Sequence, residues 1–164
     1  MKSKTKTLVS MFTVVFLITL CAGCIDSQEN VGLSISDFHF CSAIRGADDY
    51  DSHATTYTSG EQVFMYFELR GFEVRSDKSA QIYQTLTVTV PNGTPLMTDE
   101  GVSIENFEML DQSIDTTGMN FLWFNNYLWQ INESWVTGTY EVIIVVEDRV
   151  ANKSVTYSTE FNIA

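Results

Sequence analysis

The sequence from residue 31 onward predicts an all-β fold of about seven strands arranged in two packed antiparallel sheets. Short runs rich in Val, Ile, Tyr, Phe and Thr alternate in polarity with a period of two, which is typical of half-buried strands. Gly, Asn, Asp and Ser separate these runs, and no segment has a convincing helical period. The pattern favours a β-sandwich, with a small antiparallel barrel as the alternative.

The first half of this region contains three expected strands. Residues 33–40 alternate in polarity, and the polar segment 43–60 that follows is expected to be a long loop. Residues 61–69 have apolar side chains on both faces, which predicts a central strand. Residues 81–90 have one largely apolar face that should point into the core. The turn residues at 91–95, Pro-Asn-Gly-Thr-Pro, end this strand.

The second half contains four more expected strands. Residues 102–110 form a weaker strand pattern. Residues 121–131 are the most aromatic stretch and form either one long strand or two strands joined by an Asn-Asn turn. Residues 138–148 and 154–163 alternate clearly and are expected to pair as a hairpin.

Three rings of the aromatic stretch, Trp123, Tyr127 and Trp129, allow two interpretations. They can fill the core, because aromatic side chains bury the largest area per residue. They can instead form an exposed aromatic platform that binds a glycan or another polymer, such as cell-wall material. Sequence patterning leaves both interpretations open.

The run Gly-Thr-Tyr-Glu-Val-Ile-Ile-Val-Val-Glu-Asp at 138–148 resembles the penultimate strand of extracellular immunoglobulin-like domains, including PKD-like and related prokaryotic surface modules. The resemblance implies an antiparallel immunoglobulin-like β-sandwich in which residues 154–163 are the closing strand. It also implies a tyrosine corner, in which the Tyr140 hydroxyl binds back to the backbone at the edge of the sandwich.

The amino-terminal segment has the form of an export signal. Three lysines within the first six residues precede the apolar run 8–20, which is too short to cross a bilayer unaided. The following Ala22-Gly23-Cys24 resembles the lipobox of prokaryotic lipoproteins, including those of archaea, although Cys21 stands where Leu is usual. The resemblance implies that residues 1–23 are removed as a signal peptide.

The same resemblance implies that Cys24 carries a diacylglyceryl group, with residues 24–30 as lipidated cysteine and tether and residues 31–164 as the domain. Two acyl chains hold a protein on a membrane more firmly than one. The predicted location is the extracytoplasmic face of the cell membrane. An uncleaved anchor and plain secretion are the alternatives.

The charge balance argues against nucleic acid as a partner. The chain has 21 acidic and nine basic residues, and three of the basic residues would leave with the signal. Phosphate binding requires concentrated Lys and Arg, which this composition does not supply. A strongly acidic surface permits cation binding.

The first candidate metal site is the acidic run formed by Asp48, Asp49 and Asp51, with His53 nearby. Several carboxylates on one loop can supply the oxygen ligands that calcium prefers, which makes calcium the first candidate cofactor. The run lacks the spacing of an EF-hand, and a solvated charged loop is the alternative interpretation.

The second candidate combines His39 and Cys41 on one strand face with His53, since imidazole and thiolate ligands suit zinc or copper. Once residues 1–23 are removed and Cys24 is acylated, Cys41 is the only thiol, which excludes an internal disulfide. A buried, unreactive Cys41 is the simpler interpretation.

Asn132 and Asn152 each begin an Asn-X-Ser triplet and are candidate glycosylation sites, expected in exposed turns. The sequence contains no GxSxG, HExxH or GxxxxGK motif that would indicate an enzyme. We therefore predict a non-catalytic lipoprotein that binds another surface protein or a glycan.

Overall fold

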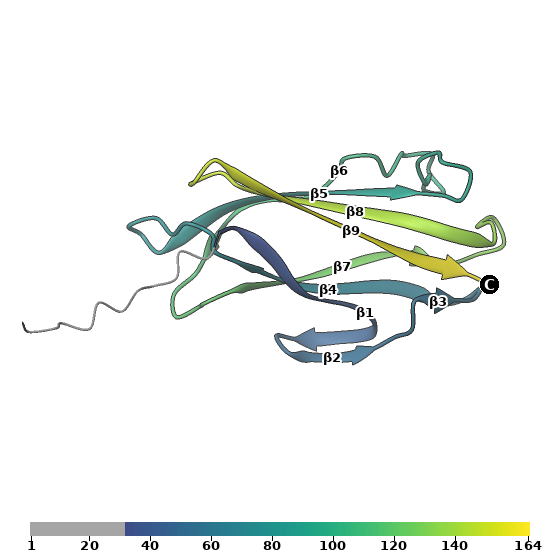
Figure 1. Ribbon diagram of the computed structural model, residues 1–164, viewed down its shortest axis with the longest axis horizontal. Coiled ribbons are helices and arrows are strands. Elements are labelled where there is room, and N and C mark those ends of the chain that lie inside the picture. Colours follow the sequence, from purple (N-terminus) through teal and green to yellow (C-terminus); the bar gives the residue numbers. More distant parts are fainter. Residues whose placement is uncertain (1–31) are drawn as a thin grey trace, which may run out of the picture.

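The computed structural model describes residues 32–164, which form nine strands in two sheets and contain no helix. Figure 1 shows the sheets as two layers, with the β1–β2 hairpin on the outer side of the four-stranded layer. The four-stranded sheet has the order β2-β1-β4-β7: Asp49–Ser52, Ser34–Gly46, Gln62–Arg70 and Leu122–Gln130. The five-stranded sheet has the order β3-β9-β8-β5-β6: Thr56–Tyr57, Lys153–Ile163, Gly138–Asp148, Ser79–Thr89 and Phe107–Asp115.

The signal peptide, the lipidated Cys24 and the tether predicted for residues 1–30 lie outside the described residues. Within residues 32–164, no helix is long and apolar enough to span a membrane.

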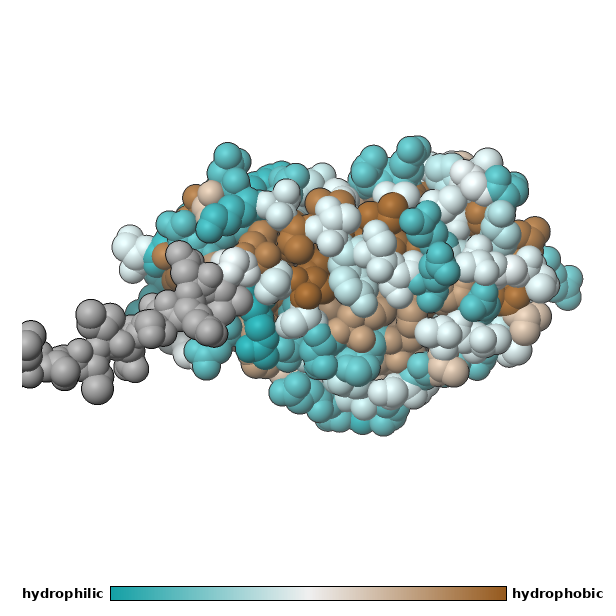
Figure 2. Space-filling model, in the orientation of Figure 1, coloured by the Kyte–Doolittle hydropathy of each residue, from teal (hydrophilic) through white to brown (hydrophobic). Residues whose placement is uncertain are grey.

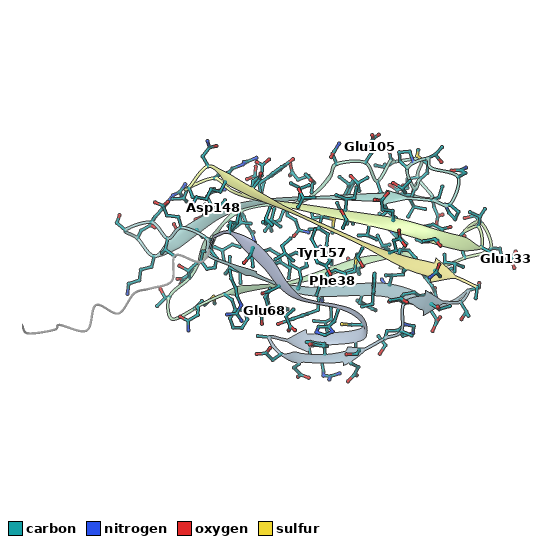
Figure 3. All side chains as sticks on the ribbon, in the orientation of Figure 1. Phe38, Glu68, Glu105, Glu133, Asp148 and Tyr157 are labelled. Atoms are coloured by element: carbon teal, nitrogen blue, oxygen red, sulfur yellow. The ribbon has the colours of Figure 1, made fainter. Side chains whose placement is uncertain are left out.

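The core lies between the two layers, where the inward faces of both sheets meet. Phe67 and Phe124 stack within the four-stranded sheet with ring centroids 4.9 Å apart, and Phe40 contacts Phe161 of the five-stranded sheet at 6.0 Å. Phe38 and Tyr157 extend this contact at one edge, side by side in Figure 3, with centroids 4.8 Å apart. Each large apolar side chain buried here contributes roughly 1.5–3 kcal/mol.

Apolar side chains also reach the surface at this edge. Figure 2 shows them as a band between the layers, on the face where β1 and β9 lie in front. The band agrees with the partly buried apolar residues that pack against the core from these strands, among them Ile35, Phe38 and Val155. They complete the core where the two sheets part.

Several predicted elements are confirmed. Strand β4 lies between β1 and β7, so both of its edges are paired, and side chains on both of its faces are buried, as the apolar pattern of residues 61–69 indicated. Strands β8 and β9 pair antiparallel along their whole length. The Tyr140 hydroxyl donates a hydrogen bond to the Val136 carbonyl oxygen at 2.9 Å, which is the predicted backbone contact.

The prediction of a long loop at residues 43–60 is wrong. Strand β1 continues to Gly46, a turn containing Asp48 in the left-handed region (φ 54°) reverses the chain, and β2 pairs back onto β1. Asp tolerates this conformation better than most residues. These polar residues can form a hairpin because it lies on the outside of the sheet, where their side chains meet water. Strands β2 and β3 raise the total from about seven to nine.

The expectation of purely antiparallel pairing is also wrong at one place. The two-residue strand β3 pairs parallel to the end of β9, through Thr56 with Asn162 and Tyr57 with Ile163. The other strand pairs are antiparallel. The chain can reach this position because the segment after β2 crosses from one sheet to the other.

Strand β6 has other bounds than the sequence predicted, and strand β7 decides between the two alternatives for the aromatic stretch. The strand expected at 102–110 is instead β6, Phe107–Asp115, because Leu96 and Ile104 are tied to Val88 by backbone hydrogen bonds at the end of β5. The aromatic stretch 121–131 is one strand, β7, and contains no Asn-Asn turn. Strands β6 and β7 are the terminal strands of their sheets.

Candidate functional site

The exposed aromatic side chains lie on the outer face of β7. The strand alternates strictly, so Leu122, Phe124 and Leu128 are buried against the core. The side chains of opposite orientation are exposed: Trp123 by 41%, Tyr127 by 57% and Trp129 by 45%. The structure thus divides the aromatic stretch between core and surface, with all three candidate platform residues on the surface.

This aromatic face continues across β4 to the β1–β2 hairpin. Tyr127 faces Phe64 with ring centroids 6.2 Å apart, and Trp123 stacks on Tyr66 at 6.5 Å. Tyr66 is in turn covered by Tyr50 of the hairpin at 4.6 Å. Burial is the largest cause that raises the pKa values of the Tyr50 and Tyr66 hydroxyls, so both are neutral donors at physiological pH.

The predicted calcium residues do not converge. Asp49 and Asp51 both bind Arg45, at 2.8 Å from its guanidinium nitrogens. The hydrogen bonds and charge of Arg45 lower the pKa of Asp51, so these carboxylates are compensated by a cation within the hairpin. The Asp48 carboxylate lies instead near those of Asp37 and Glu68. The His53 imidazole stacks on the Tyr57 ring, with ring centroids 4.3 Å apart.

The residues predicted for zinc or copper are also separate. His39 Nε2 lies 3.0 Å from Asp37 Oδ1, and the imidazole stacks on Tyr50. His53 Nε2 lies 3.3 Å from Glu61 Oε1. Cys41 is fully buried, and burial raises the pKa of its thiol, which favours the unreactive protonated form.

A different acidic cluster lies beside the aromatic face. Within residues 32–164, the carboxylates of Asp37, Asp48 and Glu68 have oxygen atoms within 4.8 Å of one another. Glu68 is 3% exposed and accepts hydrogen bonds from Arg70 and from the Tyr66 hydroxyl. In Figure 3 it lies on the side of β4 that faces the hairpin.

Sequence reasoning included Asp48, in the turn of the hairpin, but missed Asp37 of β1 and Glu68 of β4. A local signal existed for Glu68, a charged residue within the apolar pattern of a central strand. The convergence itself depends on strand register, since Ser36 pairs with Glu68 and a bulge at Asp37 (φ 50°) follows.

The candidate glycosylation residues lie in connections between strands. Asn152 is exposed in the β8–β9 turn, with φ 54°. Asn132 follows β7 and is partly exposed, and its side-chain oxygen accepts hydrogen bonds from the backbone and hydroxyl of Ser134. Cys24, the candidate lipidation site, lies outside the described residues.

The fold and site define the chain as a two-layer all-β domain with an aromatic strand face. No protein-family model matches it, and no curated protein is similar to it. Solved structures do resemble it, and among them is a family 123 glycoside hydrolase from Clostridium perfringens, which matches 80% of this chain with 16% identity and a TM-score of 0.41. The match covers 27% of that enzyme's chain, and a similarity of this size assigns neither fold family nor activity.

Proposed function

We propose that the protein is a lipid-anchored, extracytoplasmic module with an immunoglobulin-like β-sandwich that binds glycans without catalysis. Cys24 carries the anchor, residues 25–30 are the tether, and the aromatic face is the binding surface. The lipobox-like segment supports the location. The observation that carries the binding proposal is the exposure of Trp123, Tyr127 and Trp129 on one face of β7.

The chemistry of this face suits a sugar chain. Rigid aromatic rings offer a large amphipathic contact area and lose little conformational entropy on binding. Tyr127 and Trp129 are two residues apart on β7, a spacing of about 6.8 Å, and Trp123 lies four residues before Tyr127, at about 14 Å, with Asn125 between them. Rings placed along one strand in this way can contact apolar faces of an extended polymer, and the Asn125 amide can bind a hydroxyl between them. Acidic side chains of the hairpin can accept hydrogen bonds from sugar hydroxyls.

The first test is a titration of the purified protein with soluble cell-wall polysaccharide fragments, followed by tryptophan fluorescence and calorimetry. We expect an emission shift from Trp123 and Trp129, because a bound sugar removes water from the indole rings. Trp129→Ala should weaken binding by about tenfold, equal to about 1.4 kcal/mol, as expected for an aromatic anchor at an interface.

The matched control is Tyr83→Ala. Tyr83 lies on the outer face of β5 in the opposite sheet, where it contacts Arg149 at 4.3 Å, so its loss should leave glycan affinity unchanged. Equal weakening by both variants, or no response to any of the polysaccharides, would contradict the proposed function.

The second candidate function is a cation-stabilised binding module, and the convergence of Asp37, Asp48 and Glu68 favours it. Calcium takes six to eight oxygen ligands, which three carboxylates and water can supply. A bound cation would also compensate their mutual repulsion and hold the hairpin against β4. Arg70 already offsets part of the charge on Glu68, which is the argument against this function.

Thermal melts in EDTA and in excess calcium test this second function. At one hundred times its dissociation constant, calcium bound only to the native state should raise stability by about 2.7 kcal/mol. Asp37→Asn should abolish the shift, whereas Asp49→Asn, in a residue that binds Arg45, should retain it. A wild-type protein that melts at the same temperature in EDTA and in excess calcium, with an Asp37→Asn protein more stable than the wild type in EDTA, would show that the three carboxylates only repel one another.

A further inference from the structure

An apolar crevice opens between the two sheets on the side where β6 and β7 are the terminal strands within residues 32–164. Its volume is about 640 Å³, within the range of pockets that hold small molecules. Leu86 and Leu110 line it from the five-stranded sheet, and Leu122 and Leu128 line it from β7. Consecutive residues 122–129 all border the crevice, which requires that the unpaired backbone edge of β7 forms one wall.

Two buried amide side chains face this crevice from opposite sheets. Gln84 of β5 is 1% exposed, and Asn126 of β7 is 4% exposed. Neither Gln84 Nε2 nor Asn126 Nδ2 has a hydrogen-bond partner within residues 32–164. A buried donor without a partner is unfavourable, because it has lost its hydrogen bonds to water and gained none in return, so two of them in one crevice indicate that a ligand supplies the missing acceptors.

The lining also restricts the charge of the ligand. None of the side chains that border the crevice is charged. A carboxylate or ammonium group would therefore be buried without a counter-ion, which is strongly unfavourable. A neutral molecule with an apolar chain and a carbonyl oxygen satisfies both the apolar walls and the amide donors.

We propose that this crevice binds a neutral lipid-like molecule carrying an ester carbonyl, with Gln84 and Asn126 as hydrogen-bond donors. The acyl chain lies among the leucines, and the carbonyl oxygen accepts from the two amides. The hydrogen-bond donors of this site lie on the inward face of β7 and on β5, whereas the aromatic face uses outward side chains of β7. The two surfaces adjoin at the edge of β7, where Trp123, Tyr127 and Trp129 also border the crevice.

Photo-crosslinking of the full chain tests the proposal. The chain is kept soluble with a fluorinated surfactant, whose tails mix poorly with hydrocarbon. Three diazirine probes of equal chain length are compared at pH 8: a methyl ester, the free fatty acid and an alkane. We expect adducts on crevice residues such as Leu110 and Leu128. Two hydrogen bonds at about fivefold each should make the half-saturating concentration of the ester about 25-fold lower than that of the alkane, and the ester should also bind more tightly than the charged acid.

The variants Gln84→Met and Asn126→Leu separate hydrogen bonding from apolar partition. One neutral hydrogen bond contributes about fivefold in affinity, so each variant should raise the half-saturating concentration of the ester by that factor and leave the alkane unchanged. Both variants should melt at or above the wild-type temperature, because each replaces an unsatisfied amide. Should either fail to fold, Leu110→Trp, which fills the crevice, should abolish labelling by all probes.

Three results would overturn the proposal. The first is equal labelling by all three probes, which would indicate nonspecific partition. The second is an ester affinity unaffected by either amide substitution. The third is labelling that disappears as protein concentration rises and dimers form, which would show that a second copy, or a strand from it, occupies the crevice.

Discussion

At the scale of single residues, the clearest structural role belongs to Tyr140. Its ring is fully buried between Trp135 and Phe161, and its hydroxyl donates to the Val136 carbonyl oxygen, which ties the start of β8 to the segment before it. Gly138 lies within this corner at φ 135°, a conformation that favours glycine. A Cβ atom there would meet the Pro91 ring at 2.8 Å.

Tyr140→Phe should lower the free energy of unfolding by about 1 kcal/mol, because it deletes one hydrogen bond and leaves a carbonyl oxygen without its donor. In a domain of this size that corresponds to a fall of about 4 °C in Tm. Thermal denaturation followed by circular dichroism measures the effect. Tyr157→Phe, which removes a partly exposed hydroxyl, is the control and should change Tm little; equal effects would show that the corner contributes nothing.

The sequence indicated this residue because its signal is local. Gly-X-Tyr before an alternating apolar run places the hydroxyl within reach of the backbone four residues earlier. Gln84 is also recognisable in the sequence, since it interrupts an apolar strand face, but the sequence does not indicate that Asn126 lies across the crevice from it. Asn126 lies on another sheet, and no periodicity relates the two positions.

At the scale of elements, the β1–β2 hairpin is the feature that shapes the outer surface. Arg45 binds Asp49 and Asp51 along its length, and Tyr50 lies over Tyr66. The Arg45 interaction lowers the pKa of Asp51. A lowered carboxyl pKa contributes stability above the unfolded pKa of about 3.9, and this stability is lost as pH falls through the lower folded value.

The hairpin should therefore lose protection against amide exchange as the pH falls from about 5 to 2. Arg45→Met should remove that contribution, so residues 49–52 should exchange faster at pH 7, and their protection should depend less on pH. Hydrogen exchange followed by mass spectrometry, expressed as protection factors, measures this. Strands β8 and β9 serve as the internal reference. Equal protection of residues 49–52 in both proteins at pH 7 would contradict the role of Arg45.

At the scale of the whole molecule, negative charge dominates. The formal net charge is −12 at pH 7, and the sequence pI is about 4.3. Like charges on a compact surface repel one another and oppose folding. Salt weakens this repulsion, since the screening length falls from about 30 Å at 0.01 M to about 3 Å at 1 M.

We expect Tm at pH 7 to rise by several degrees when sodium chloride is increased from about 10 mM to 0.5 M. The control is the same salt series at pH 4.3, where the net charge is near zero and the rise should be much smaller. A Tm that falls with salt at pH 7 would mean that attractive ion pairs, such as Arg149 with Asp111, outweigh the repulsion.

Taken by itself, the sequence determined the all-β class, a central β4 and the β8–β9 hairpin. These features depend on alternation over a few neighbouring residues, which directly reflects the two faces of a strand. The same reasoning mistook 43–60 for a loop, because an exposed hairpin needs no buried face and so leaves little apolar pattern.

Only the tertiary structure decided which side chains meet. Asp37, Asp48 and Glu68 converge because of the register of β1 on β4 and the fold of the hairpin. Gln84 and Asn126 face one crevice because the two sheets pack against each other. Trp123, Tyr127 and Trp129 are exposed because β7 directs its alternate residues away from the core. Where one face of a strand is polar, the pattern itself indicates the buried face, but both faces of β7 carry large apolar side chains, so only packing of the sheets determines which of them is buried.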